Sequence, residues 1–165
     1  MTTSTSPSKS ALPTPETVAQ IITGLIGRSV SVKKAPALVR GKTPTATAVY
    51  VCDDGKLRGA AVADIALASS AGAALTLLPA PDAAQAVKTG QWNDALAENF
   101  REILNVASNV FNVPGQPHTR LRDVFLTPNA LPPEVEAGIK AASGRLDIEV
   151  SIPGYGPGKM TVYNF

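Results

Sequence analysis

The chain has few of the residues that build metal centres and nucleophilic active sites. It contains one cysteine and one histidine among 165 residues, so it cannot form an intrachain disulfide, and a metal site made by this chain is not expected. Cys52 lies in the apolar run VYVC, which predicts a buried thiol, and His118 lies in the polar stretch GQPHTR, which predicts a loop. We therefore expect no metal cofactor to be bound by this chain.

Strong charge and long hydrophobic runs are also lacking. Only 17% of the residues are charged, the formal net charge is +2, and the most basic stretch, GRSVSVKK, is typical of a strand with solvated lysines. The apolar stretch IALASSAGAALTLLP is short and interrupted by serine and glycine, and the N-terminus has no apolar core of a secretory signal. We expect a soluble, cytoplasmic protein without a nucleic-acid or membrane partner.

What the chain does have is enough apolar residues, 44%, to bury one substantial core. Residues 1–13 are rich in Ser, Thr and Pro and are expected to form a disordered tail, followed by one domain over 14–165. Thr14 and Gly27 are the expected cap and stop of a first helix, and alternation predicts a strand over 29–37.

The remaining elements mix strands and helices. TATAVYVC and LRGAAVADI predict two strands joined at Asp54–Gly55. Helices are expected over 66–77, after Pro81 with Gly90 as its end, from Trp92 or Asn93 to Asn112, and in PPEVEAGIKAAS. Further strands are expected in TRLRDVFL, RLDIEVSI and KMTVYNF. GYGPGKM lacks the first glycine and the hydroxyl residue of a phosphate-binding loop, so a hairpin loop is expected there. This pattern indicates an α+β fold, an antiparallel or mixed sheet with helices packed on it.

The helix in ENFREILNVASNVFN carries an unusual polar face. At about 100° per residue, an apolar stripe lies on one face and a polar ridge on another. The apolar stripe is Leu96, Phe100, Ile103, Ala107 and Val110, with Leu104 and Phe111 at its border. The polar ridge is Glu98, Glu102, Asn105, Asn109 and Asn112. Asparagine is a mediocre helix former, so this ridge is better suited to docking a partner than to solubility alone.

The spacing within this ridge resembles a known signature. Glu102-x2-Asn105, with Glu98 four residues earlier and Pro128 after a gap of 22 residues, resembles the Asp/Ser-x3-Glu-x2-Asn-x22-Pro pattern of the CheC/CheX/FliY chemotaxis phosphatases. Gly59, before the small-residue strand, fits the same organisation, and the resemblance spans roughly residues 15–165. Glu98 departs from the family, which has Asp or Ser there. One motif per chain is similar to the single-site, CheX-like branch, and implies a CheC-like fold.

The resemblance also implies a reaction. The substrate would be the phosphoaspartate of a CheY-like response-regulator receiver domain, which would carry its own Mg²⁺ and a lysine. Asn105 would orient the attacking water, and Glu102 would dock the receiver lysine. Glu98 and Asn109 would contact the partner, Glu98 as a rim charge or by positioning Arg101. Pro128 is expected to be structural.

Several alternatives stay open on the sequence alone. Glu102 and Asn105 could belong to an ordinary solvated face, or the chain could be a non-catalytic interaction module of the same fold, a flagellar-switch-like adaptor. A small-ligand domain using LTPNALPP as its binding loop is a third possibility, without positive support. The CheX-like resemblance also implies a homodimer, for which the small-residue strands or KMTVYNF would pair across a two-fold axis. Burial of Glu102 or Asn105 would argue against the phosphatase.

Overall fold

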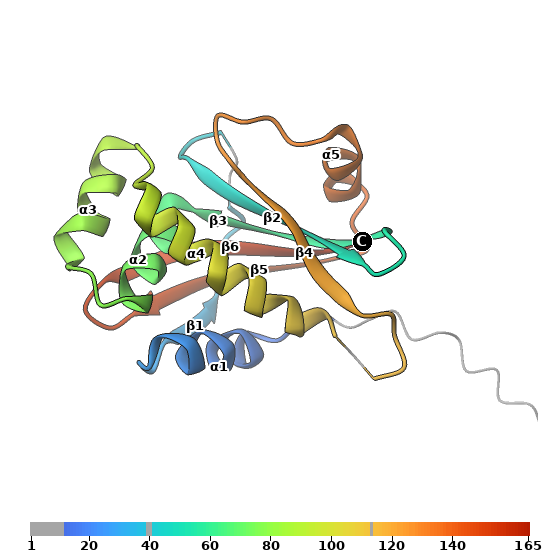
Figure 1. Ribbon diagram of the computed structural model, residues 1–165, viewed down its shortest axis with the longest axis horizontal. Helices are drawn as coiled ribbons and strands as arrows, with labels where there is room; N and C mark the ends of the chain where they lie inside the picture. The colour runs from blue at the N-terminus through green and yellow to red at the C-terminus, as the bar shows by residue number, and fades with distance from the viewer. Residues whose placement is uncertain (1–11, 39–40, 113) are drawn as a thin grey trace, which may run out of the picture.

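The computed structural model describes residues 12–38, 41–112 and 114–165. Within these ranges the centre of the molecule is a six-stranded sheet in which all neighbouring strands are antiparallel (Figure 1). Across the sheet the order is β1 (Ser31–Lys34), β5 (Gly144–Ile152), β6 (Gly156–Asn164), β3 (Leu57–Asp64), β2 (Thr45–Cys52) and β4 (Thr119–Leu126). The expected α+β architecture, an antiparallel sheet with helices packed on it, is therefore confirmed.

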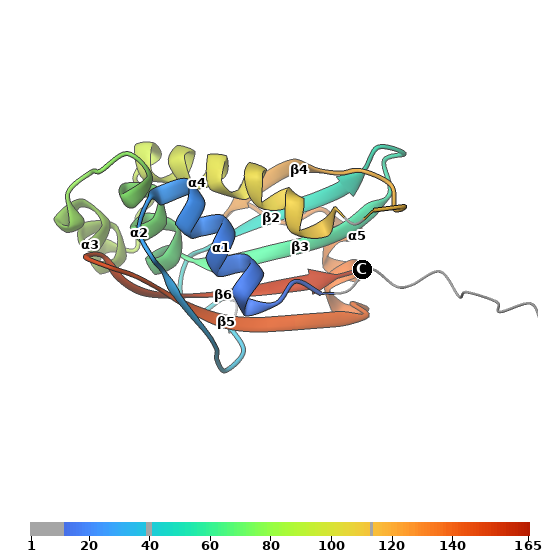
Figure 2. The ribbon, with the colours of Figure 1, turned by 90° about the horizontal axis from the view of Figure 1, so that it is seen from below.

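Helices cover the two faces of this sheet unequally. The main core lies between one face and the helices α1 (Pro15–Ile26), α2 (Ile65–Leu75) and α4 (Asp94–Ala107). Figure 2 shows α1 and α4 lying side by side over the strands. The other face packs against α5 (Pro133–Lys140), and α3 (Ala80–Thr89) packs on the far side of α2. The helix α4, which carries the polar ridge, thus belongs to the three helices that cover the main core.

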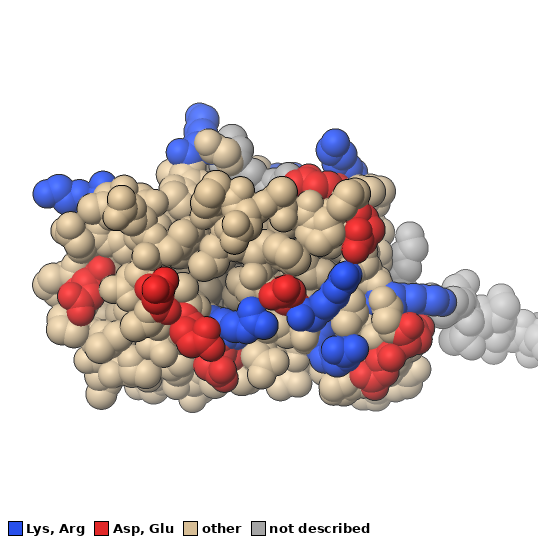
Figure 3. All heavy atoms as spheres, turned by 45° about the horizontal axis from the view of Figure 1, so that its top comes forward, with Lys and Arg blue, Asp and Glu red and all other residues tan. Residues whose placement is uncertain are grey.

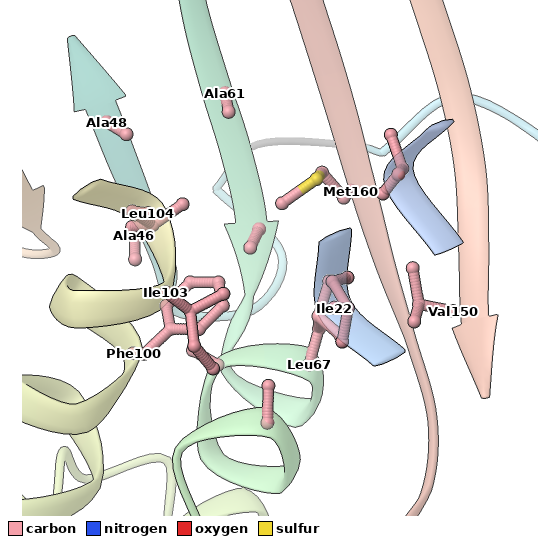
Figure 4. Packing of buried hydrophobic residues seen from close by; sticks show 14 of the residues in the cluster. Ile22, Ala46, Ala48, Ala61, Leu67, Phe100, Ile103, Leu104, Val150 and Met160 are labelled. Carbon is pink, nitrogen blue, oxygen red and sulfur yellow. The ribbon is translucent and has the colours of Figure 1, made fainter. Parts of the chain in front are cut away.

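Small residues let the helices approach closely. Alanines face α4 from β2 and β3, and larger apolar side chains of α4 fill the space between them (Figure 4). The contacting residues include Ala46, Ala48, Ala61, Phe100, Ile103 and Leu104. A Cβ on Gly72 of α2 would lie 2.2 Å from the carbonyl oxygen of Leu96, so the backbones of α2 and α4 touch at this point. The position of α4 is therefore set by backbone contact as well as by side chains.

The helix caps and turns predicted from the sequence are confirmed. Thr14 caps α1 by accepting a hydrogen bond from the Thr17 N–H, and Gly27 ends the helix in the left-handed conformation. Gly90 ends α3 in the same way. Gly55, with φ of 85°, makes the turn between β2 and β3, and the GYGPG stretch forms the β5–β6 hairpin.

The tail predicted over residues 1–13 lies mostly outside the described part of the chain, which starts at Leu12. Leu12 packs against Gly144, and Pro13 is buried. The strand expected over 29–37 is shorter than predicted, since only Ser31–Lys34 pairs with β5. None of the described helices has the length and apolar character needed to cross a membrane.

The pairing surface expected for a dimer is wrong. The strand β6, which contains KMTVYNF, lies between β5 and β3, and the small-residue strands β2 and β3 also have neighbours on both sides. An interior strand has no free backbone groups to offer a second chain. The edges of the described sheet are β1 and β4, so neither KMTVYNF nor the small-residue strands have a free edge for the predicted pairing.

Candidate functional site

The polar ridge begins on a well-capped helix. The Asn93 Oδ1 accepts hydrogen bonds from the N–H groups of Ala95 and Leu96, at 3.0 and 3.2 Å, and so caps α4. The α-helix ends at Ala107, earlier than the predicted Asn112, and continues as the 3₁₀ turn η1 (Ser108–Phe111). Tightening of a last turn into 3₁₀ geometry is a common way to satisfy terminal carbonyl groups.

The turn of α4 that carries Asn105 is hydrogen-bonded to the sheet beneath the helix. Tyr50 on β2 is buried, and its hydroxyl donates a 2.8 Å hydrogen bond to the carbonyl oxygen of Leu104. Its ring packs on Phe111 with centroids 4.9 Å apart. Burial raises the pKa of Tyr50 well above its ordinary value, so the hydroxyl remains a donor at neutral pH. Nothing in the apolar run around Tyr50 signals this long-range contact in the sequence.

Two asparagines of this region have structural tasks. Asn99 Nδ2 donates to the Gly72 carbonyl at 2.9 Å and to the Thr76 hydroxyl at 2.8 Å, which links α4 to α2. Asn112 Oδ1 accepts from the Thr119 N–H at 2.7 Å, and its Nδ2 donates to the Thr119 carbonyl at 3.3 Å. Asn112, placed on the ridge by sequence periodicity, therefore anchors the end of the helical segment to β4.

Glu102 and Asn105 differ from these residues. Both are exposed on the outer face of α4, one turn apart, and within the described chain neither side chain makes a hydrogen bond or an ion pair. Asn109 is exposed too, but its Oδ1 accepts a 3.4 Å hydrogen bond from Asn112 Nδ2. Among the five asparagines between 93 and 112, all of which are described, Asn105 is the one whose amide has no partner.

The outer face of α4 is acidic. Asp94, Glu98 and Glu102 are all exposed and follow one another at steps of four residues, and Figure 3 shows acidic side chains in a row on this face of the molecule. On the β4 side, Arg101 makes a 3.3 Å ion pair with Asp123. Asp123 is thus the ion-pair partner of Arg101, and the role of Glu98 as a rim charge of the partner contact stays a prediction.

Pro128 lies away from Glu102 and Asn105. It follows β4 in an exposed loop after a cis Thr127–Pro128 peptide bond. The Thr127 carbonyl accepts a 2.9 Å hydrogen bond from the indole of Trp92, just before α4 begins. Asn105 is some 13 residues further along, or about 20 Å of helix. The proline of the sequence pattern thus sits at the opposite end of α4 from the Glu–Asn pair.

The LTPNALPP loop borders a hollow of about 180 Å³ against β2 and α5, lined by Thr45, Thr47, Phe125 and Leu131 among others, without a cluster of catalytic groups. Within the described ranges, no group of three or more His, Cys, Asp and Glu side chains is arranged to hold a metal ion.

Comparison with known proteins places the fold. No family model matches the chain, and no curated protein does. Among solved structures, FliM in the FliM–SpeE complex from H. pylori matches with a TM-score of 0.61 and 10% identity, covering 91% of this chain and 80% of that one. FliY from Thermotoga maritima matches with a TM-score of 0.58 and 12% identity, covering 98% and 91%.

The chain has the fold of FliM and FliY. CheX from the CheX–CheY–BeF3–Mg²⁺ complex of Borrelia burgdorferi also matches, at 11% identity over 88% of this chain and 91% of that one, with a lower TM-score of 0.41. Identities this low show the fold alone. Because one fold hosts unrelated tasks, the choice of function rests on the residues of α4.

Proposed function

We propose that the protein is a phosphatase acting on the phosphoaspartate of a CheY-like receiver domain, with Asn105 and Glu102 as its working residues. The observation that carries the proposal is the state of this pair. Both side chains are exposed and unpartnered within the described chain, while neighbouring Asn99, Arg101 and Asn112 are all engaged. An amide without a structural task, beside a carboxylate, is free to act on a partner.

Hydrolysis of the receiver phosphoaspartate needs few catalytic groups from this chain. An acyl phosphate is an activated phosphoryl donor, so hydrolysis mainly needs a water held in line with the phosphorus and stabilised charge. The Asn105 carboxamide oxygen accepts a hydrogen bond from that water and turns its lone pair toward phosphorus. An amide has no useful pKa, so it orients the water without acting as a base. The receiver's own Mg²⁺ and lysine supply the positive charge.

Glu102 sets the register of docking. Residues at i and i+3 of a helix have Cβ atoms about 5–6 Å apart, so one receiver active site can contact both side chains. Glu102 pairs with the receiver lysine, and Glu98 and Asn109 extend the contact along the helix. An ion pair across a desolvated interface has a coupling energy of about 1.5 kcal/mol or more, which corresponds to roughly a tenfold change in affinity.

Rigid support of α4 favours this role. The helix is held by backbone contact with α2, by the Tyr50–Leu104 hydrogen bond and by the Asn112–Thr119 pair. A catalytic amide must keep its geometry within about 0.5 Å, which is easier on a helix locked to a sheet than on a loop.

The test is to phosphorylate candidate receiver domains and to follow the loss of phosphoaspartate with and without the protein. We expect one receiver to lose its phosphoryl group faster, and Glu102→Gln to weaken its binding about tenfold. Asn105→Ala should lower the rate at saturating receiver, because the group that orients the water is lost, whereas Asn109→Ala, one turn further along, removes only a docking contact and should leave that rate unchanged. If no receiver is dephosphorylated faster, the non-catalytic adaptor becomes the better account of this face.

A further inference from the structure

An exposed leucine stands in an unfavourable conformation at the end of α2. Leu77 is 71% exposed, and with φ of 57° it is the one non-glycine residue in the described chain with positive φ. The position after a helix normally holds Gly or Asn, because the left-handed region is unfavourable for other side chains. The turn is held by a 2.8 Å hydrogen bond from the Leu78 N–H to the Ala73 carbonyl. Because the side chain of Leu77 is mostly exposed, its burial contributes little to the stability of the folded chain.

Leu77 adjoins the outer face of α4. Its neighbour Thr76 accepts a hydrogen bond from Asn99, which lies one turn before Glu102 and about 60° around the helix from it. Val106, 37% exposed, lies on the same flank of α4, one turn beyond Glu102. The opposite flank carries the Arg101–Asp123 ion pair. The row of acidic side chains formed by Asp94, Glu98 and Glu102 is therefore bordered on its α2 side by the apolar Leu77 and Val106. On its β4 side it is bordered by the charged Arg101–Asp123 pair.

The size of a typical protein interface is large enough to extend from Glu102 and Asn105 toward Leu77. A typical specific interface covers about 800 Å² on each partner, which corresponds to a patch of roughly 16 Å radius. Glu102 lies about one helical turn from Asn99, and Asn99 is hydrogen-bonded to Thr76, the neighbour of Leu77, so Leu77 lies within reach of the border of such a patch.

We infer that Leu77 and Val106 form an apolar flank of the docking surface, and that this flank receives an exposed apolar side chain of the receiver domain beside the lysine bound by Glu102. The inference rests on the proposed function, because the receiver is the partner that Glu102 and Asn105 imply. Burial of an exposed leucine against a partner gives binding energy, which offers a reason for keeping it where Gly or Asn would suit the backbone better.

Leu77→Asn separates docking from folding. Asparagine tolerates positive φ, so the variant should unfold at the same or a higher temperature than the wild type. The binding partner in the assay is the receiver that is dephosphorylated in the screen, loaded with BeF3⁻ and Mg²⁺ so that it mimics the phosphorylated state. We expect the Kd of this complex to rise about tenfold for Leu77→Asn, since the contribution of a buried leucine is lost.

Val87→Ser is the matched control. Val87 is also an exposed apolar residue, at 44%, but it lies on α3 about 160° around the helix from Gln85. Gln85 and Thr89 line the hollow that faces Trp92 and the start of α4. Val87→Ser should therefore leave the Kd unchanged.

The outcomes distinguish this inference from the proposed function. If Leu77→Asn binds the receiver within twofold of wild type while Asn105→Ala lowers the phosphatase rate about 100-fold, the apolar flank is refuted and the function stands. If Leu77→Asn weakens binding but Asn105→Ala retains the full rate, the docking surface stands and the mechanism fails. A change in self-association of Leu77→Asn without a change in receiver binding would assign Leu77 to contact between copies. Binding of no receiver at all would overturn both.

Discussion

Replacing Gly72 with alanine tests whether α2 holds α4 in its working position. A Cβ on Gly72 would lie 2.2 Å from the Leu96 oxygen and 3.0 Å from the Leu96 carbonyl carbon, both backbone atoms of α4. Even close carbon–oxygen contacts in proteins are about 3.3–3.6 Å, so the helices must separate by roughly 1 Å. The hydrogen bond from Asn99 to the Gly72 carbonyl would be strained by the same movement.

The size of the effect follows from three contributions. Overpacking costs about 1–3 kcal/mol, and loss of the Asn99 hydrogen bond costs about 1 kcal/mol. The better helix propensity of alanine returns about 1 kcal/mol. We expect a net loss of about 1–3 kcal/mol in the free energy of unfolding, or about 3–10 °C in Tm for a domain of this size.

Gly24→Ala is the control for this substitution. Gly24 lies in the interior of α1, and a Cβ added there would meet no other atom within 4 Å, so alanine should stabilise the protein by about 0.5–1 kcal/mol. Urea denaturation of both variants, read by circular dichroism, gives the comparison. If Gly72→Ala proves as stable as Gly24→Ala, the close backbone contact between α2 and α4 is not present.

Two further substitutions test the supports of the fold. Burial raises the pKa of Asp64, the cap of α2. Because the folded pKa lies above the ordinary 3.8, this carboxyl contributes stability at low pH and loses it as pH rises from 3.8. Asp64→Asn keeps an acceptor for the Leu67 N–H. The free energy of unfolding of this variant, relative to that of the wild type, should therefore rise as the pH increases above 3.8. Wild-type and variant curves that run parallel with pH would contradict the raised pKa of Asp64. Asn112→Ala removes both bonds to buried Thr119 and should cost about 1–3 kcal/mol in urea denaturation, against little for Asn109→Ala.

Local signals in the sequence predicted the elements well. Thr14, Gly27 and Gly90 mark helix ends through capping and left-handed geometry, which depend on neighbouring residues alone. The Asp54–Gly55 turn and the apolar stripe of α4 were likewise readable, because a turn or a helix face is set by short-range spacing. The exposure of Glu102 and Asn105 follows from the same periodicity.

Features set by distant contacts could not be predicted. The apolar pattern of KMTVYNF suits an edge or an interior strand, so it did not reveal that β6 lies between β5 and β3. Asn112 was grouped with Asn105 because they share a helix face, and only the approach of Thr119 on β4 separates their tasks. The anchoring of Leu104 by Tyr50, 54 residues away, also leaves no local trace. Leu77 needed the observed backbone angle to stand out.

The central claim is that the Asn105 amide orients the water that attacks a receiver phosphoaspartate. The most direct measurement is the rate of phosphoaspartate loss at saturating protein, compared between wild type and Asn105→Ala, with the Kd for the BeF3⁻-loaded receiver determined on the same samples. Loss of a positioning group predicts a rate about 100-fold lower with an unchanged Kd. An Asn105→Ala variant that removes the phosphoryl group at the wild-type rate would contradict the account.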